Sequence, residues 1–287
     1  MKKFILKSLL SISISIVIFI SFYFISDYFL NKKDYDENSF YIWGDSQAYH
    51  GLNIETIKST TKIKTYSGAK HGAGMYDFLF FASKVPEKSK VILAISKTIQ
   101  LRRIDVDYHL SGLNFSALID LFNKEYPLFI IKKTFVNNLK PKKFFSEDLI
   151  AFPCLDTLTI KDPLAIFKKT FSKTPTYLIN KQNLYKRGIE LLIAKKCKII
   201  YIEFPYHESL QKIEKVSPTR KYTQNFKIEL SKQYHISPFD TLIISKKINP
   251  MYDYTHLNVI GANLVSEKIS DLIIKNKWNS FLIVELD

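Results

Sequence analysis

The chain has 287 residues, of which 46% are hydrophobic and 14% aromatic, enough to bury a sizeable core and to exclude a disordered or fibrous protein. Its formal net charge of +15 favours anionic partners such as phosphate, anionic lipid or acidic polysaccharide, although a general abundance of lysine explains the charge equally well. Nucleic acid is not expected, because the sequence has no zinc-finger, helix-turn-helix or RNP-like motif.

The first predicted element is a membrane-spanning helix at the amino terminus. Residues 8–26 carry no charge, and a helix of this length is close to what crosses the apolar core of a bilayer. Lys2, Lys3 and Lys7 precede it, so the positive-inside rule leaves the amino terminus in the cytoplasm. A cleaved signal peptide is the alternative, but the bulky exit FYFISDYFL offers no small-residue cleavage site. We therefore expect an uncleaved single-pass anchor over residues 1–30 and an extracytoplasmic domain, on the periplasmic or cell-surface side.

A short charged linker over residues 31–38 leads to the predicted domain, residues 39–287. The domain alternates strands with helices of amphipathic spacing. Strands are predicted at 40–43, 62–66, 91–95, 198–204 and 241–244, and helices at 52–60, 76–82, 183–194, 223–234 and 259–274, the last closing the domain. Apolar strands that alternate with helices predict a three-layer α/β/α fold with a mostly parallel sheet.

The alternation of strands and helices breaks over residues 98–181. This interval is too long for a simple crossover, and it contains the amphipathic stretch FSALIDLFNKEYPLFIIKKTF. We expect a helical insertion, which either lies beside the active site, as insertions in such folds do, or is a structural appendage.

Cys154 and Cys197 lie far apart and lack the spacing of a metal site. In an extracytoplasmic domain these two cysteines can form a disulfide, but the position of Cys197 at the start of a buried strand favours two free thiols. No metal or other cofactor is expected, since the sequence has no HExxH motif, P-loop or Rossmann glycine motif.

Gly44-Asp45-Ser46 directly follows the first predicted strand. Functional residues of an α/β sheet gather at the carboxyl ends of its strands, so the Ser46 hydroxyl is expected at that edge. The same three residues also suit an ordinary turn. A catalytic role for Ser46 therefore requires a base that activates the hydroxyl.

His256 is the histidine best placed to be that base. Asp253 precedes it by three residues, so both side chains can lie on one side of a turn, with the carboxylate fixing the tautomer of the imidazole. The pair lies between the last predicted strand and the closing helix, at the same sheet edge as Ser46. Asn258 is predicted to cap that helix.

Three glycines, Gly68, Gly72 and Gly74, follow the second predicted strand. A backbone without side chains can present N–H groups to an oxyanion there, although a plain strand-to-helix turn explains these glycines as well. His50 and His71 fall near the proposed site and can bind substrate, but a hydrogen-bonded loop histidine is the more common role.

Taken in order, these motifs resemble the SGNH/GDSL hydrolase superfamily: Gly-Asp-Ser after the first strand, a glycine after the second, and Asp-x-x-His before the last helix. YSGAKHGAGMYDF and MYDYTHLNVIGA resemble its membrane-anchored extracytoplasmic branch, which includes alginate O-acetylation and teichoic-acid D-alanylation proteins. The resemblance implies a flavodoxin-like SGNH hydrolase fold with Ser46 as nucleophile, His256 as base and Asp253 as the orienting acid. It also implies an oxyanion hole that includes the N–H groups of Ser46 and Gly72.

One position departs from the family pattern. The superfamily places an Asn in a Gly-x-Asn-Asp loop after the third strand, whereas this chain has AISKTIQ. Either Ser96 or Lys97 replaces that donor or the donor is absent, and losing one oxyanion donor costs about a hundredfold or more in rate. Asp45, His71 and Ser96 are the candidate substrate contacts, with Asp45 expected to organise the turn rather than react.

We expect a membrane-anchored serine acyl-ester enzyme that forms an acyl-Ser46 intermediate. The acyl group then passes to water, as in an esterase or deacetylase, or to a sugar hydroxyl, as in an O-acyltransferase. The expected partners are an acyl donor and an envelope carbohydrate or anionic polymer. The alternative is a weakly catalytic or non-catalytic protein that uses this fold to bind and recruit a polytopic membrane acyltransferase, which the missing Asn favours.

Overall fold

The computed structural model describes residues 2–31, 38–71, 73–94, 145, 175–217, 220–236 and 239–287. Helix α1 (Lys2–Asn31) and the α/β domain belong to different compact units of the chain. The predicted insertion lies outside the described residues except for Phe145 and the first turns of α9 (Pro175–Ala194). Its helical character therefore stays a prediction.

The uncharged amino-terminal run is helical, as the sequence predicts. Many apolar side chains of α1 are exposed, and they include Leu9, Leu10, Ile12, Ile14, Ile16, Val17, Ile18, Phe19, Ile20, Phe22 and Ile25. Among the residues that the structure describes, no helix is long and apolar enough to cross a membrane. The anchor over residues 1–30 and the location that it implies stay predictions.

The domain is built on a six-stranded sheet in the order β2-β1-β3-β4-β6-β5. The strands are β1 (Phe40–Trp43), β2 (Thr65–Ser67), β3 (Lys90–Ala94), β4 (Lys198–Glu203), β5 (Phe239–Ile244) and β6 (Ser280–Leu286). Every pairing between them is parallel, so the predicted α/β class with a parallel sheet is confirmed. After β2 the chain crosses to the other side of β1 to form β3, and this reversal creates the kind of crevice where ligands bind in such sheets.

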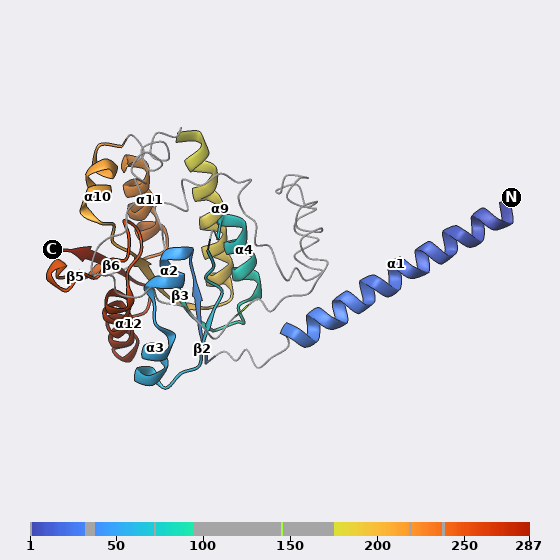
Figure 1. The fold of residues 1–287 in the computed structure, drawn as a ribbon, viewed down its shortest axis with the longest axis horizontal. Coiled ribbons are helices and arrows are strands. Elements are labelled where there is room, and N and C mark those ends of the chain that lie inside the picture. Colours follow the sequence, from blue (N-terminus) through green and yellow to red (C-terminus); the bar gives the residue numbers. More distant parts are fainter. Residues whose placement is uncertain are drawn as a thin grey trace. The chain divides into compact units, whose positions relative to one another are not determined.

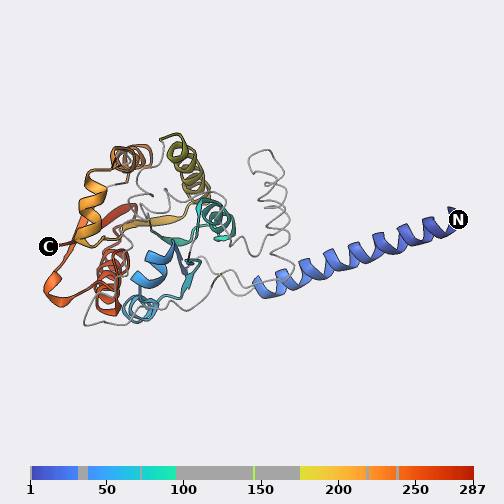
Figure 2. The same ribbon diagram turned by 45° about the horizontal axis from the view of Figure 1, so that its top comes forward.

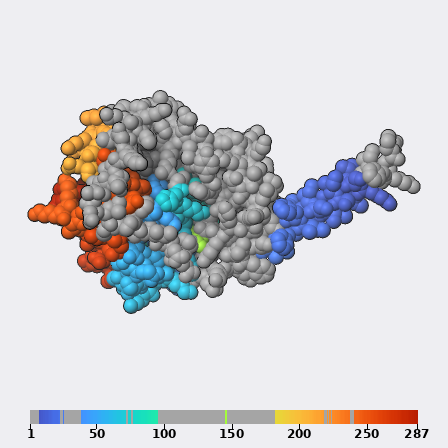
Figure 3. Space-filling model, viewed as in Figure 1, coloured from blue at the N-terminus to red at the C-terminus, as the bar shows by residue number. Residues whose placement is uncertain are grey.

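Helices cover both faces of the sheet (Figures 1 and 2). On one face lie α2 (Ser46–Gly51), α3 (Ile54–Thr61) and α12 (Val259–Ile274), with α3 and α12 side by side on the surface (Figure 3). On the other face α4 (Met75–Lys84) packs on α9, which also contacts α11 (Arg220–Gln233), while α10 (Glu208–Lys215) follows β4. This arrangement is consistent with the predicted three layers.

The first strand shows why the sequence forms a central strand. All four residues of FYIW are buried, because successive side chains point to opposite faces and both faces are covered by helices. Phe40 and Ile42 belong to the core beneath α3 and α12. On the opposite face, the Trp43 ring lies 4.6 Å from that of Phe78 in α4.

Two elements at the carboxyl end of the chain correct the predicted order. The helix 259–274 is present as α12, but it does not close the domain, because β6 follows it and pairs with both β4 and β5. Helix α10, which was not predicted, follows the strand β4. A short apolar run near a chain end gives no local indication of its partners, so the position of β6 in the sheet depends on long-range packing.

Candidate active site

Ser46 is the first residue of α2, directly after β1 at the carboxyl edge of the sheet. The short helix begins here because Asp45 caps it, its carboxylate accepting a hydrogen bond of 2.9 Å from the backbone N–H of Gln47. Asp45 is fully buried. Its role is therefore to organise the turn, as expected, and it presents no surface to a substrate.

Gly44 lets the chain turn closely against two alanines. A Cβ atom at this position would lie 2.4 Å from the Cβ of Ala48 and 2.7 Å from that of Ala94. Alanine side chains cannot rotate away, so only a residue without a side chain fits without a backbone shift. The glycine therefore fixes how closely α2 approaches β3.

Asp253 and His256 lie on a tight loop between β5 and α12. An antiparallel bridge between Met251 and Leu257 closes the loop, and the Tyr252 N–H donates to the His256 carbonyl at 2.9 Å. Asp253 Oδ1 accepts from the backbone N–H groups of Thr255 and His256 at 2.7 and 2.8 Å. The carboxylate thus orders its own loop before it contacts the imidazole.

The structure brings Ser46, His256 and Asp253 together in one chain of hydrogen bonds. His256 Nδ1 lies 2.7 Å from Asp253 Oδ2, and His256 Nε2 lies 2.9 Å from Ser46 Oγ. With the Nδ1 proton donated to the carboxylate, Nε2 carries the lone pair and accepts from the hydroxyl. This is the geometry of a nucleophile, a base and an orienting acid.

The pKa of the Asp253 carboxyl lies below its usual value. Burial by itself raises this pKa, but the hydrogen bond and the charge of His256, with the N–H groups of Thr255 and His256, outweigh it. Asp253 therefore stays ionised and can stabilise a positive charge on the imidazole.

Further polar contacts, which the sequence did not reveal, hold the histidine loop in place. Gln47 Nε2 donates to the Thr255 carbonyl at 2.7 Å, which joins α2 directly to the loop that carries Asp253 and His256. The His207 N–H donates to the Tyr254 carbonyl at 3.0 Å from the other side. Asn258 caps α12 as predicted, accepting from the N–H groups of Ile260 and Gly261. The contacts of Gln47 with Thr255 and of His207 with Tyr254 join residues far apart in sequence, so no local pattern indicates these two.

His50 and His71 contact each other beside Ser46, Asp253 and His256. Their Nε2 atoms lie 2.7 Å apart, and the His50 ring lies 5.7 Å from the His256 ring in an edge-on arrangement. His50 is buried at the end of α2, whereas His71 is exposed on the segment after β2. Both histidines are therefore near the site, as expected.

Two of the three glycines that follow β2 use their N–H groups within the fold. The Gly68 N–H donates to the Ile42 carbonyl at 2.8 Å, and the Gly74 N–H donates to Asp77 Oδ2 at 2.9 Å. For Gly68 and Gly74 the structure favours the turn alternative over an oxyanion role, because β1 and the start of α4 engage their N–H groups. Gly72 and Ser96 lie outside the described residues. Their predicted roles stay predictions.

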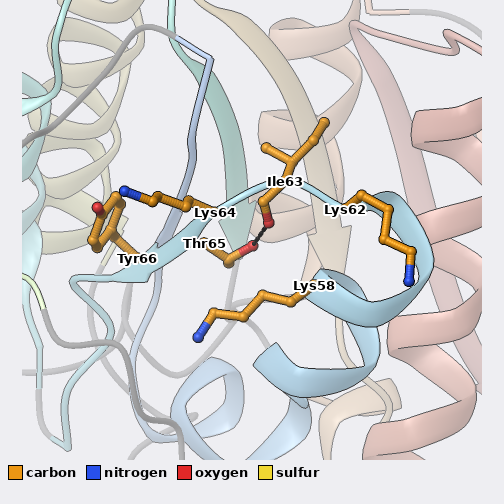
Figure 4. A pocket seen from close by; sticks show the side chains of 6 residues that line it. All are labelled: Lys58, Lys62, Ile63, Lys64, Thr65 and Tyr66. Atoms are coloured by element: carbon orange, nitrogen blue, oxygen red, sulfur yellow. Dashed lines mark hydrogen bonds between the residues drawn. The ribbon is translucent and has the colours of Figure 1, made fainter.

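A cavity of about 350 Å³ lies away from this site, at the amino end of β2. It is lined by Lys58, Lys62, Ile63, Lys64, Thr65 and Tyr66. The three lysine amino groups point in different directions and do not converge on one point (Figure 4). The cavity therefore offers no focused anion site and takes no part in the chemistry at the opposite edge.

The described residues include one cysteine, which is buried, and no cluster of potential metal ligands. Cys197 is a free, buried thiol, as favoured by its position, and burial raises its pKa to about 11. The described part of the chain holds no group of three or more His, Cys, Asp or Glu that could bind a metal ion. Cys154 lies outside that part.

No family model and no curated protein matches the chain.

Proposed function

We propose that the chain is a serine acyl-ester enzyme that forms an acyl-Ser46 intermediate. The observation that carries the proposal is the continuous hydrogen-bonded chain from Ser46 Oγ through His256 to Asp253. Hydroxyl, imidazole and carboxylate in this order make a serine nucleophilic at neutral pH.

In the first half-reaction Ser46 Oγ attacks the carbonyl carbon of an acyl donor while His256 Nε2 takes the hydroxyl proton. The carboxylate of Asp253, 2.7 Å from Nδ1, stabilises the imidazolium that forms. His256 then protonates the leaving group, which departs and leaves the acyl group on Oγ. Ser46 is only 7% exposed, so the charge on the imidazolium develops in a site shielded from bulk water. Electrostatic stabilisation is stronger in such a site than in water.

We further propose that the chain belongs to the SGNH/GDSL superfamily, which its sequence motifs resemble, and the fold supports this assignment. The order β2-β1-β3-β4 is the order of a flavodoxin-like sheet, and Ser46 follows β1 at its reversal point. The order β6-β5 at the far edge is an elaboration of that sheet. It lies away from the strand that carries Ser46.

A membrane-tethered, extracytoplasmic setting is part of the same proposal. It rests on the uncharged run 8–26 and the lysines before it, as well as on the apolar side chains exposed around α1. In that setting the net charge of +15 suits an envelope glycan or an anionic polymer as substrate or acceptor.

The test is covalent labelling of the detergent-solubilised full chain by a serine-directed fluorophosphonate. We expect labelling of the wild type, its loss in Ser46→Ala and His256→Ala, and no change in Ser59→Ala, whose serine lies on the exposed face of α3. If the folded wild type is not labelled, the proposed enzymatic function is wrong.

The second candidate, a weakly catalytic partner that recruits a polytopic acyltransferase, rests on the sequence AISKTIQ after β3, where the family has an Asn donor. It is favoured if the folded chain stays unlabelled and yet co-purifies with a multispanning membrane protein. Labelling at Ser46 excludes the non-catalytic form of this candidate.

A further inference from the structure

The transfer of the acyl group from Ser46 requires an acceptor hydroxyl next to His256. In this half-reaction the acceptor oxygen bonds to the acyl carbon, the bond from that carbon to Ser46 Oγ breaks, and the acceptor proton moves to His256 Nε2 and then to Oγ. The acceptor must therefore come within about 3 Å of Nε2. Side chains that border the His256 ring are the ones that can contact the acceptor.

The His50–His71 pair borders this position. The His50 ring lies edge-on to the His256 ring at 5.7 Å, and the His71 ring contacts the His50 ring with 4.4 Å between their centres. His50 is 3% exposed and cannot meet an incoming molecule, whereas His71 is exposed. Of these two imidazoles, His71 is therefore the one that can contact an incoming molecule.

The bond between the two histidines fixes the position of His71. Nε2 of one ring must donate and Nε2 of the other must accept across 2.7 Å, so each ring determines the tautomer of the other. Tyr49 contacts both imidazoles, with ring centres at 4.9 and 5.0 Å. His50 therefore orients His71 much as Asp253 orients His256.

We propose that His71, positioned by His50, binds the hydroxyl group of the acyl acceptor beside His256. The acceptor class that fits is a sugar or other polyol, because a hydroxyl can both donate to and accept from the proton-sharing imidazole pair. This inference rests on the proposed acyl-serine function and adds a specificity residue to the second half-reaction. Neither histidine forms the acyl bond in this scheme.

The experiment compares acylation with transfer in the same preparations. The reactivity of Ser46 is measured as its rate of labelling by fluorophosphonate. Transfer is measured as the rate at which the acetyl group of p-nitrophenyl acetate is passed to glycerol or methyl glucoside, each supplied at graded concentrations. For His71→Asn we expect the ratio of transfer to labelling to fall about tenfold or more, with a raised half-saturating acceptor concentration. His235→Asn is the matched control, since His235 is exposed after α11 and has a left-handed backbone that Asn adopts readily.

Two substitutions of His50 test positioning separately. His50→Phe keeps the ring but cannot bond to His71 Nε2, so it should raise the half-saturating acceptor concentration, and His50→Gln, whose amide reaches the same place, should restore it. A labelled wild type with an unchanged ratio in His71→Asn overturns this inference alone. A folded but unlabelled wild type overturns the proposed function and the inference with it.

Discussion

Replacing Asp253 by Asn tests the proposed chemistry without dismantling the loop. The Asn Oδ1 can still accept the N–H groups of Thr255 and His256, which lie 2.7 and 2.8 Å from Asp253 Oδ1. At the Oδ2 position, however, an amide NH₂ would face His256 Nδ1 at 2.7 Å. Two donors cannot share that contact, so the imidazole must take the tautomer with its proton on Nε2.

In that tautomer His256 cannot accept the Ser46 proton across the 2.9 Å contact between Nε2 and Oγ. We expect the labelling rate to fall by on the order of 10⁴, a loss of about 5 kcal/mol of transition-state stabilisation. The melting temperature should fall only modestly near neutral pH, because the loop hydrogen bonds persist while the stabilisation by the ionised carboxylate is lost. Asp271→Asn, which changes a carboxylate paired with Lys275 on the surface of α12, is the control.

The assay is the second-order rate of fluorophosphonate labelling, measured on chains whose melting curves are recorded in parallel. A rate for Asp253→Asn within tenfold of the wild type would refute the assigned role of the carboxylate. If the rate is lost only together with the fold, the carboxylate acts on stability, and the assignment fails as well.

Three further predictions concern stability. Gly44→Ala should destabilise the domain by about 1–3 kcal/mol, measured by denaturant unfolding, because its Cβ would meet Ala48 and Ala94 at 2.4 and 2.7 Å. Lys195→Met should cost about 1–3 kcal/mol in the same assay, since Nζ donates to three carbonyl oxygens at the end of α4 at 2.6–2.8 Å. The lowered pKa of Asp253 means that its stabilisation is present above the unfolded-state pKa of about 3.9 and is lost as the pH falls through the folded-state pKa. The free-energy difference between the wild type and Asp253→Asn should therefore shrink as the pH drops below about 4.

Each of these predictions has a control. For Gly44→Ala, the control is the double variant Gly44→Ala/Ala48→Gly, which removes the 2.4 Å contact with the Ala48 Cβ and should recover part of the stability. If the double variant recovers none, crowding against Ala48 is not the cause of the destabilisation. The exposed Lys232→Met should change the free energy of unfolding by less than about 0.5 kcal/mol. If the wild type and Asp253→Asn lose stability in parallel between pH 6 and 2, the carboxylate does not contribute through its ionised form.

Much of the architecture could be predicted because its strands and helices depend on residues that are close together in the sequence. Strand β3 and helix α12 lie where apolar runs and helical spacing placed them. Asn258 was predicted to cap α12 because capping involves residues only two or three positions away. The neighbours Asp253 and His256 were paired for the same reason, since one turn of chain brings them together.

Some features that the sequence left open depend on partners that are distant in sequence. Gly68 has no local feature that engages its N–H group, and only the adjacent β1 supplies the acceptor. The place of β6 between β4 and β5 depends on which strand edges are open after the rest of the sheet has formed. Such choices follow from the packing of the whole domain rather than from any window of residues.

The sequence by itself determined the α/β alternation, because strand, turn and capping preferences act over a few positions. It also singled out Ser46, Asp253 and His256 as the candidate site residues. Only the tertiary structure decided that Ser46 and His256, separated by 210 residues, meet at 2.9 Å. It also decided that a second pair of imidazoles lies beside them. Distances between remote side chains depend on strand order and on how closely the layers pack, and these are properties of the folded domain.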